Sequence, residues 1–196
     1  MSDQPITALL LAAGAGTRFG GAKLLHPLDD GVAIAAHAAR NLIAAGVLDV
    51  VAVLRPGDFP LADLLEQEGC YVTFCADAAR GMGHSLAHGV GTSRQAKGWI
   101  VALADMPRVN PQTIRAIRGA LDSGAVLAAP MYRGERGHPV GFSAVLGNEL
   151  LTLSGDTGAR KVFERHAHEA TCIECDDPGI AIDIDRRADI EQHRPV

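Results

Sequence analysis

The sequence predicts an α/β fold: a three-layer α/β/α sandwich in which helices cover both faces of a mostly parallel, twisted sheet. Short apolar runs alternate with longer amphipathic runs, as in proteins built from strand–helix units. The chain has 196 residues, 47% of them hydrophobic, which is enough for one sizeable core. No internal repeat, low-complexity tract or long linker interrupts it, so we expect a single domain over residues 1–196.

Up to Pro130 the alternation is regular. Residues 32–45 are rich in alanine and stop at Gly46, which favours a helix ended by glycine. Asn110 and Pro111 supply an N-cap and a first-turn proline for a later helix. The expected strands are residues 6–12, 49–54, 71–75, 99–104 and 126–129, and the expected helices are residues 32–45, 59–68, 84–90 and 111–121.

Beyond Pro130 the pattern loosens. Residues 131–139 are rich in Gly and Arg, which predicts a loop. The other expected elements are strands at 140–143, 171–175 and 180–184, helices at 148–153 and 159–168, and a last helix from Arg187. Ligands of open α/β sheets bind beyond the carboxyl ends of the strands, so functional residues are expected there.

The bulk properties exclude several classes of protein. The net charge of −5 argues against a nucleic-acid-binding protein, which needs a basic face. Residues 1–5 lack the features of a secretory signal, and no apolar run approaches the ~20 residues that span a bilayer. We therefore expect a cytoplasmic protein without membrane contact. In that reducing compartment the four cysteines should be free thiols packed as small hydrophobes, and Cys172-x-x-Cys175 lacks the second ligand pair of a zinc site.

A glycine-rich segment, residues 11–23, follows the first expected strand. Glycines permit positive φ and close backbone approach, so successive N–H groups can point at one anion. Arg18 and Lys23 add two cations, and this combination suits a triphosphate. The structural alternative is a turn that only reverses the chain.

Two other nucleotide-binding motifs do not match this segment. The dinucleotide fingerprint G-x-G-x-x-G begins at Gly14 and Gly16, but Phe19 occupies its third glycine position. The second strand is followed by Arg55 rather than by the acidic residue that binds a ribose. The Walker loop fails because Ala22 stands where its lysine is required. An NAD-dependent oxidoreductase is therefore disfavoured.

The apolar strand at residues 99–104 ends abruptly in a carboxylate, Asp105. Mg²⁺ takes oxygen ligands, commonly one or two carboxylates with phosphates and waters. Asn110 is the better cap for the next helix, which leaves Asp105 without a structural role. Asp105 is therefore a candidate metal ligand.

The opening segment, L-A-A-G-x-G-x-R-F-G-x-x-K after an N-terminal strand, resembles the signature of nucleotidyltransferases of the GT-A type. Together with L-A-D-M-P at residues 103–107 it is most similar to the molybdenum cofactor cytidylyltransferase family of MobA-like NTP transferases. The resemblance covers nearly the whole chain and implies a Rossmann-like nucleotidyltransferase fold. It implies catalytic roles for Arg18, Lys23 and Asp105. The nucleotide-binding residues that it implies are Leu11, Ala12, Ala13, Gly14, Gly16, Arg18, Lys23, Gly81, Met82 and Ser85.

A second acidic segment near the C-terminus resembles the family's D-I-D-T-P-E-D-L segment. The resemblance implies that Asp185 joins Asp105 in binding Mg²⁺, or alternatively Mn²⁺, with Asp183 as the fallback ligand. Two carboxylates two residues apart on a strand point to the same side. Residues 186–188 are Arg-Arg-Ala where the family has T-P-E, and a solvated strand end is the structural alternative.

Two further segments resemble parts of the family that lie near the acceptor substrate. Arg136 and His138 belong to R-G-H-P-V, and Asp156 and Arg160 belong to G-D-x-G-A-R. The resemblance implies that these four residues bind the acceptor. Asp156 and Thr157 are also suitable N-caps for the helix that follows.

The function that the resemblance implies is transfer of CMP from CTP to molybdopterin, giving molybdopterin cytosine dinucleotide and pyrophosphate. It further implies a contact with a molybdenum hydroxylase or its chaperone. One alternative is a nucleotidyltransferase that uses another small phosphorylated acceptor, such as a sugar or polyol phosphate. Another is a non-catalytic nucleotide-binding accessory protein for cofactor insertion. A phosphate monoester is already an anion at neutral pH, so the transfer needs no general base.

Overall fold

Four parallel strands form one half of the sheet, in the order β3-β2-β1-β4. The computed structural model describes residues 4–192. The strands are β1 (Ile6–Leu11), β2 (Asp49–Leu54), β3 (Tyr71–Phe74) and β4 (Gly98–Leu103). Their register pairs Leu11 with Val53 on one side and with Leu103 on the other, so three strands reach the same edge of the sheet together. The residues that follow them share that edge.

The other half of the sheet is mixed. β7 (Val140–Ser143) runs antiparallel to both β4 and β5 (Leu127–Tyr132), and β8 (Ala170–Glu174) runs parallel to β5. The expected mostly parallel sheet is confirmed, with β7 and the two-residue strand β6 (Glu135–Arg136) running in the opposite direction.

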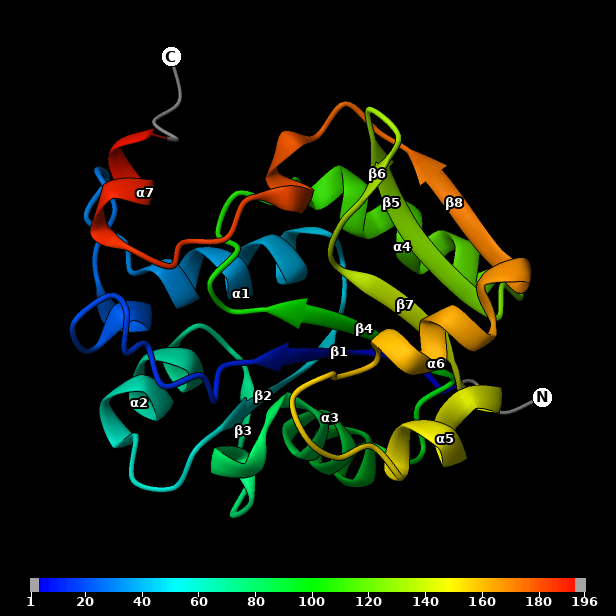
Figure 1. Ribbon diagram of the computed structural model, residues 1–196, viewed down its shortest axis with the longest axis horizontal. Helices are drawn as coiled ribbons and strands as arrows, with labels where there is room; N and C mark the ends of the chain where they lie inside the picture. The colour runs from blue at the N-terminus through cyan, green and yellow to red at the C-terminus, as the bar shows by residue number, and fades with distance from the viewer. Residues whose placement is uncertain (1–3, 193–196) are drawn as a thin grey trace.

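Helices cover both faces of the sheet, as Figure 1 shows. β1 is buried on both sides: Ala8 and Leu10 pack with one group of helices, and Leu9 and Leu11 with the other. The first group comprises α1 (Ile34–Ala44), α2 (Phe59–Gln67) and α4 (Pro111–Asp122), and the second comprises α3 (Met82–Thr92), α5 (Gly147–Leu151) and α6 (Arg160–Arg165). The three-layer α/β/α arrangement expected from the sequence is therefore confirmed.

The start of α4 agrees with the sequence in detail. The Asn110 side chain accepts a hydrogen bond of 2.8 Å from the Gln112 backbone N–H, and Pro111 occupies the first helical position. The cap fixes where the connection after β4 ends, and Asp105 lies within that connection.

The loop expected over residues 131–139 is partly wrong. β5 continues to Tyr132 and pairs antiparallel with β6 (Glu135–Arg136), leaving Arg133 and Gly134 as a two-residue turn. Both turn residues have positive φ, 52° and 83°, as a type I′ hairpin requires. Arginine is an uncommon residue at positive φ, so this hairpin has only a weak signal in the sequence.

The strand expected over residues 180–184 is wrong. The chain forms a 3-10 helix there, η5 (Pro178–Ala181). Buried Asp177 caps it, accepting a 3.0 Å hydrogen bond from the Gly179 N–H and a 2.7 Å bond from the Thr113 hydroxyl. These two hydrogen bonds to Asp177 hold the chain in the turn of η5 in place of an extended strand.

The remaining expectations hold with shifted ends. A last helix, α7 (Arg187–Gln192), begins at the expected residue. All four cysteines are free, but only Cys70 and Cys75 are buried, and Cys172 is exposed on β8. Within residues 4–192, no helix combines the length and the apolar character that crossing a membrane requires.

Candidate functional site

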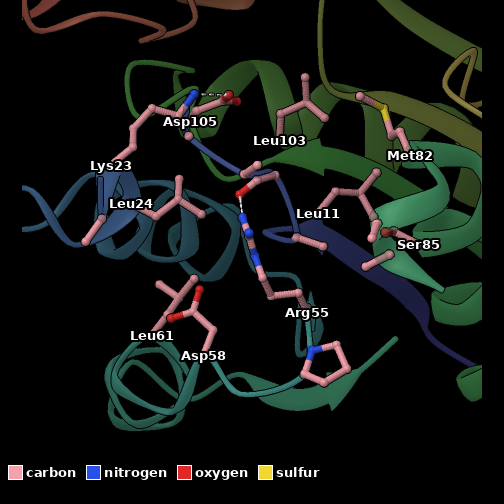
Figure 2. Close-up of a pocket in the computed structure, with 18 of the residues that line it drawn as sticks. Leu11, Lys23, Leu24, Arg55, Asp58, Leu61, Met82, Ser85, Leu103 and Asp105 are labelled. Atoms are coloured by element: carbon pink, nitrogen blue, oxygen red, sulfur yellow. Dashed lines mark hydrogen bonds and ion pairs between the residues drawn. The ribbon is translucent and has the colours of Figure 1, made fainter. Parts of the chain in front are cut away.

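A cavity of about 860 Å³ opens beyond the carboxyl ends of β1, β2 and β4 (Figure 2). The glycine-rich loop after β1 forms one wall, and the segments after β2 and before α3 form the others. The expected nucleotide-binding residues that line it are Leu11, Ala13, Gly14, Gly16, Lys23, Gly81, Met82 and Ser85. Ala12 is buried behind this wall, and Arg18 lies on the outer side of the loop with an exposed side chain.

The glycine-rich loop presents its backbone amides to the cavity side without partners. Among the described residues, the N–H groups of residues 13–18 donate to no protein acceptor. Gly16, Gly20 and Gly21 have φ values of 58°, 87° and 131°, a conformation that side-chain-bearing residues rarely adopt. Four of these six residues are exposed and the other two are half-buried, so their free N–H groups are open to an anionic ligand.

Lys23 and Arg18 converge on two of the expected acids. Lys23 Nζ lies 2.8 Å from Asp105 Oδ2 and 3.4 Å from Asp185 Oδ1, and Arg18 donates to Asp185 Oδ2 at 2.8 Å. The Lys23 side chain is 10% exposed, because it belongs to the short 3-10 helix η1 (Lys23–Leu25) that packs against α1. The structure thus brings all four residues together from three distant segments.

Backbone contacts bring the two acidic segments side by side. The Ile184 N–H donates to the Asp105 carbonyl at 2.9 Å, which sets the residues on either side of Ile184 against the end of β4. Asp189 on α7 accepts hydrogen bonds from the backbone N–H groups of Asp185 (2.8 Å) and Arg186 (2.6 Å). This carboxylate orders the turn before the last helix, where the sequence departs from the family's T-P-E.

Asp105, Asp183 and Asp185 form a cluster in which one ligand atom from each lies within 4.8 Å of the others. Three carboxylates offer the hard oxygen ligands that Mg²⁺ and Mn²⁺ take, so the residues present fit a divalent cation. Asp183, expected only as a fallback, is as much part of the cluster as Asp185.

The Asp185 carboxylate titrates below its usual range. Partial burial raises its pKa, but the hydrogen bonds and charges of Arg18 and Lys23 together lower it further than burial raises it. Asp185 is therefore ionised at neutral pH, as a metal ligand must be.

The segment before α3 forms the less polar wall of the cavity. Gly81 has φ 123°, and a Cβ there would lie 2.4 Å from the Gly155 carbonyl carbon, so only glycine fits. The Gly83 N–H donates to the Gly155 carbonyl at 2.8 Å, which brings Asp156 to the cavity wall. The capping alternative for Asp156 and Thr157 is wrong, because α6 begins at Arg160 with Ala159 as its N-cap residue.

The other expected acceptor residues lie outside the cavity lining. The Arg136 guanidinium stacks 3.8 Å from the centre of the Phe163 ring, and exposed Arg160 pairs with Glu164 at 2.8 Å. His138 is half-buried, and its backbone N–H donates to the Ile180 carbonyl at 2.9 Å. This bond places His138 near the acidic segment. Burial and the Arg136 charge lower the pKa of His138, which keeps the imidazole neutral at pH 7.

Several cavity residues were not expected from the sequence. Arg55 and Asp58 line the cavity from the segment between β2 and α2, and Leu61 lines it from α2; Figure 2 shows Arg55 reaching into its centre. An arginine that follows an apolar strand lies at the ligand edge of a parallel sheet, and that signal was present. From the sequence, Arg55 counted only as evidence against a dinucleotide-binding site, which needs an acidic residue there.

The comparisons with known proteins agree with this geometry. The model of the MobA-like NTP transferase domain matches residues 8–170. Nicotine blue oxidoreductase of Paenarthrobacter nicotinovorans is 30% identical over 200 residues, which cover 94% of each chain. The crystal structure of Rv0371c from Mycobacterium tuberculosis H37Rv superimposes with a TM-score of 0.83 at 26% identity over 98% of each chain. A further Rv0371C structure, a complex with manganese, gives a TM-score of 0.78 at 24% identity, over 96% of this chain and 97% of the other.

The family model covers most of the chain, and the fold and the loop that it implies are present, with Asp105 lining the cavity and Asp183 and Asp185 clustered beside it. The chain belongs to the MobA-like NTP transferase domain family and is a nucleotidyltransferase of that type.

Proposed function

We propose that this nucleotidyltransferase transfers CMP from CTP to the phosphate of molybdopterin, forming molybdopterin cytosine dinucleotide and releasing pyrophosphate. The observation that supports it most is the meeting of free loop amides, Lys23 and three carboxylates at one end of a nucleotide-sized cavity. The choice of CTP and of molybdopterin rests on the sequence motifs that resemble the cytidylyltransferase branch.

The cavity has two chemically different ends. Lys23 and Asp105 mark a charged end, whereas Leu11, Met82 and Ser85 mark an end that is mostly apolar (Figure 2). A nucleoside triphosphate has the same division, so its phosphates belong beside the loop and Lys23, and its base and ribose beside the N-terminus of α3.

The reaction requires positioning and charge neutralisation more than proton transfer. An acceptor phosphate oxygen attacks the α-phosphorus of CTP, a new P–O bond forms, and the bond to pyrophosphate breaks. Lys23 and the loop amides hold the triphosphate and stabilise the charge that builds on the leaving pyrophosphate. Asp105, Asp183 and Asp185 would hold Mg²⁺ or Mn²⁺, which supplies further positive charge at the phosphates when bound.

The acceptor is expected on the side of the acidic cluster. Gly137 packs so closely on η5 that a Cβ there would lie 2.3 Å from the Ile180 carbonyl oxygen, and Ile180 precedes Asp183 by three residues. Arg136 and His138 flank this contact. We propose that they bind the acceptor phosphate together with Asp156 and with Arg160, which lies on the same helix, α6, as the Phe163 ring that Arg136 contacts.

A pyrophosphate-release screen tests the proposal. Each of the four NTPs is combined with molybdopterin, with a sugar phosphate and with a polyol phosphate, with Mg²⁺ and then with Mn²⁺. We expect release with CTP and molybdopterin, and the loss of that release in Asp105→Asn, whose side chain has nearly the same shape. Release with a different acceptor would assign the transferase to that substrate instead.

Two other outcomes of the screen replace the proposal. Binding of CTP without pyrophosphate release for any acceptor would make the chain a non-catalytic accessory protein for cofactor insertion. The relative from Paenarthrobacter nicotinovorans is named as an oxidoreductase, so oxidation of NADH and NADPH is followed in parallel.

Hand-over of the product to a molybdenum hydroxylase or its chaperone is a further part of the proposal, tested by co-purification with such an apo-enzyme.

A further inference from the structure

Arg55 is an unexplained cation inside the nucleotide cavity. It follows β2 and is half-buried, and no carboxylate pairs with it among the described residues. Its Nε is buried without a hydrogen-bond partner, and its terminal NH2 group donates to the Gly14 carbonyl (Figure 2). A half-buried cation tied to a single backbone oxygen needs a reason, because the burial of charge is costly.

The position of the Gly14 oxygen determines where the next amide points. In a planar trans peptide the C=O of one residue and the N–H of the next lie on opposite sides of the bond. Arg55 holds the Gly14 oxygen on its own side of the loop, so the Ala15 N–H points away from Arg55. Figure 2 shows the Lys23–Asp105 pair across the loop from Arg55, where the phosphates are proposed to bind.

The same peptide is able to flip when it is not held. Gly14 is exposed, and nothing lies within 4 Å of the place where its Cβ would be. A flip of the Gly14–Ala15 peptide would move Ala15 from its negative φ to a positive one, which is unfavourable for an L-residue but not forbidden. The flipped loop would present a carbonyl oxygen, not an N–H, to the phosphates.

We infer that Arg55 is a positioning residue: by binding the Gly14 carbonyl it keeps the Ala15 N–H turned toward the polyphosphate. The Ala15 side chain is the second restraint on the same peptide, since it disfavours the flipped φ. This inference rests on the proposed nucleotide site and adds the residue that orients its loop.

Three variants test the inference: Arg55→Met, Ala15→Gly and the two combined. The dissociation constants of CTP and of pyrophosphate are measured with Mg²⁺ and without an acceptor. Arg55→Met is expected to weaken both ligands about tenfold, the order of a lost charge-assisted hydrogen bond. Because both substitutions release one peptide, the double variant should lose more affinity than the product of the two single losses. Arg55→Lys should recover most of the binding, since its ammonium can also donate to the Gly14 oxygen.

The amide resonance of Ala15 gives a second readout that needs no ligand. Arg55→Met should shift the Ala15 ¹H–¹⁵N signal in the free protein, with an unchanged melting temperature showing that the fold is intact. An unchanged signal, together with independent effects of the two substitutions, would overturn the inference and make Arg55 a direct ligand contact. A loss limited to CTP, with pyrophosphate binding unaffected, would overturn it in favour of base recognition. If the wild type bound neither ligand, the proposed function would fail, while the Ala15 signal would still report on the peptide.

Discussion

Removing the Asp189 carboxylate is the sharpest test of how the acidic cluster is held in place. Asp189 belongs neither to the cavity lining nor to the acidic cluster, yet its Oδ2 accepts hydrogen bonds of 2.8 and 2.6 Å from the backbone N–H groups of Asp185 and Arg186. Asp189→Ala therefore leaves every proposed ligand in the sequence and removes only the support of one of them. Glu191→Ala is the matched control, since it removes an exposed carboxylate from the same helix.

The size of the effect follows from the two hydrogen bonds. Hydrogen bonds to charged groups contribute roughly 1.5–3 kcal/mol each, and sharing one half-exposed oxygen between two donors reduces their sum to about 2 kcal/mol. For a chain of this length, that loss lowers the melting temperature by about 4–8 °C. Residues that orient metal ligands typically change metal affinity or activity by about 10–100-fold, so the metal concentration for half-maximal activity should rise by that factor.

The assay is pyrophosphate release at saturating nucleotide and acceptor over a series of Mg²⁺ concentrations, with a melting curve for each variant. We expect Asp189→Ala to require more metal than wild type and to approach the wild-type rate at saturation, and Glu191→Ala to match wild type in both. A metal requirement unchanged in Asp189→Ala, despite the lower melting temperature, would show that Asp185 does not bind the metal or does not need this support.

Three further outcomes are expected. Asp105→Ala should abolish pyrophosphate release and keep a folded protein by circular dichroism; near-normal turnover would refute its role. Lys23→Ala should lower kcat more than it raises the KM for CTP, and an unchanged kcat would assign Lys23 to a surface role. Hydrogen bonds to the carboxylates of Glu169 and Glu149 raise the pKa of His166. Protonated His166 therefore stabilises the folded protein. This contribution is complete below about pH 6.5, the ordinary pKa of histidine, and is lost as pH rises through the raised pKa. Urea unfolding of His166→Asn and wild type from pH 5.5 to 8.5 should therefore show a difference that shrinks with pH.

The sequence predicted best what depends on residues close together in the chain. The apolar run of β1 and the N-cap at Asn110 are local features, and both are present as expected. Lys23 and Asp105 were placed together because each follows or ends a strand at one edge of a parallel sheet, and they form an ion pair of 2.8 Å. The sheet topology brings these two residues, each predicted from its own local segment, into one site.

The features that the sequence did not predict depend on contacts between distant residues. Residues 180–184 alternate like a strand, but the bond from Thr113 to Asp177 and the cap that Asp177 provides favour η5 instead. Arg55 lies 41 positions after the Gly14 carbonyl that it binds, and no local pattern links the two. Asp189 orders the turn before α7 by accepting a hydrogen bond from the Asp185 N–H, a contact that becomes visible only once the turn is folded.

The charges of the site indicate an order of binding. Three clustered carboxylates face two bonded cations, Arg18 and Lys23, so the cluster keeps one net negative charge without further ligands. A triphosphate brought alone to this end of the cavity would meet free amides on one side and repulsion from the cluster on the other. A divalent cation held by these carboxylates would reverse the sign of the cluster, and Lys23 would then be free to turn to the phosphates. We therefore expect the cation to bind before the nucleotide or together with it.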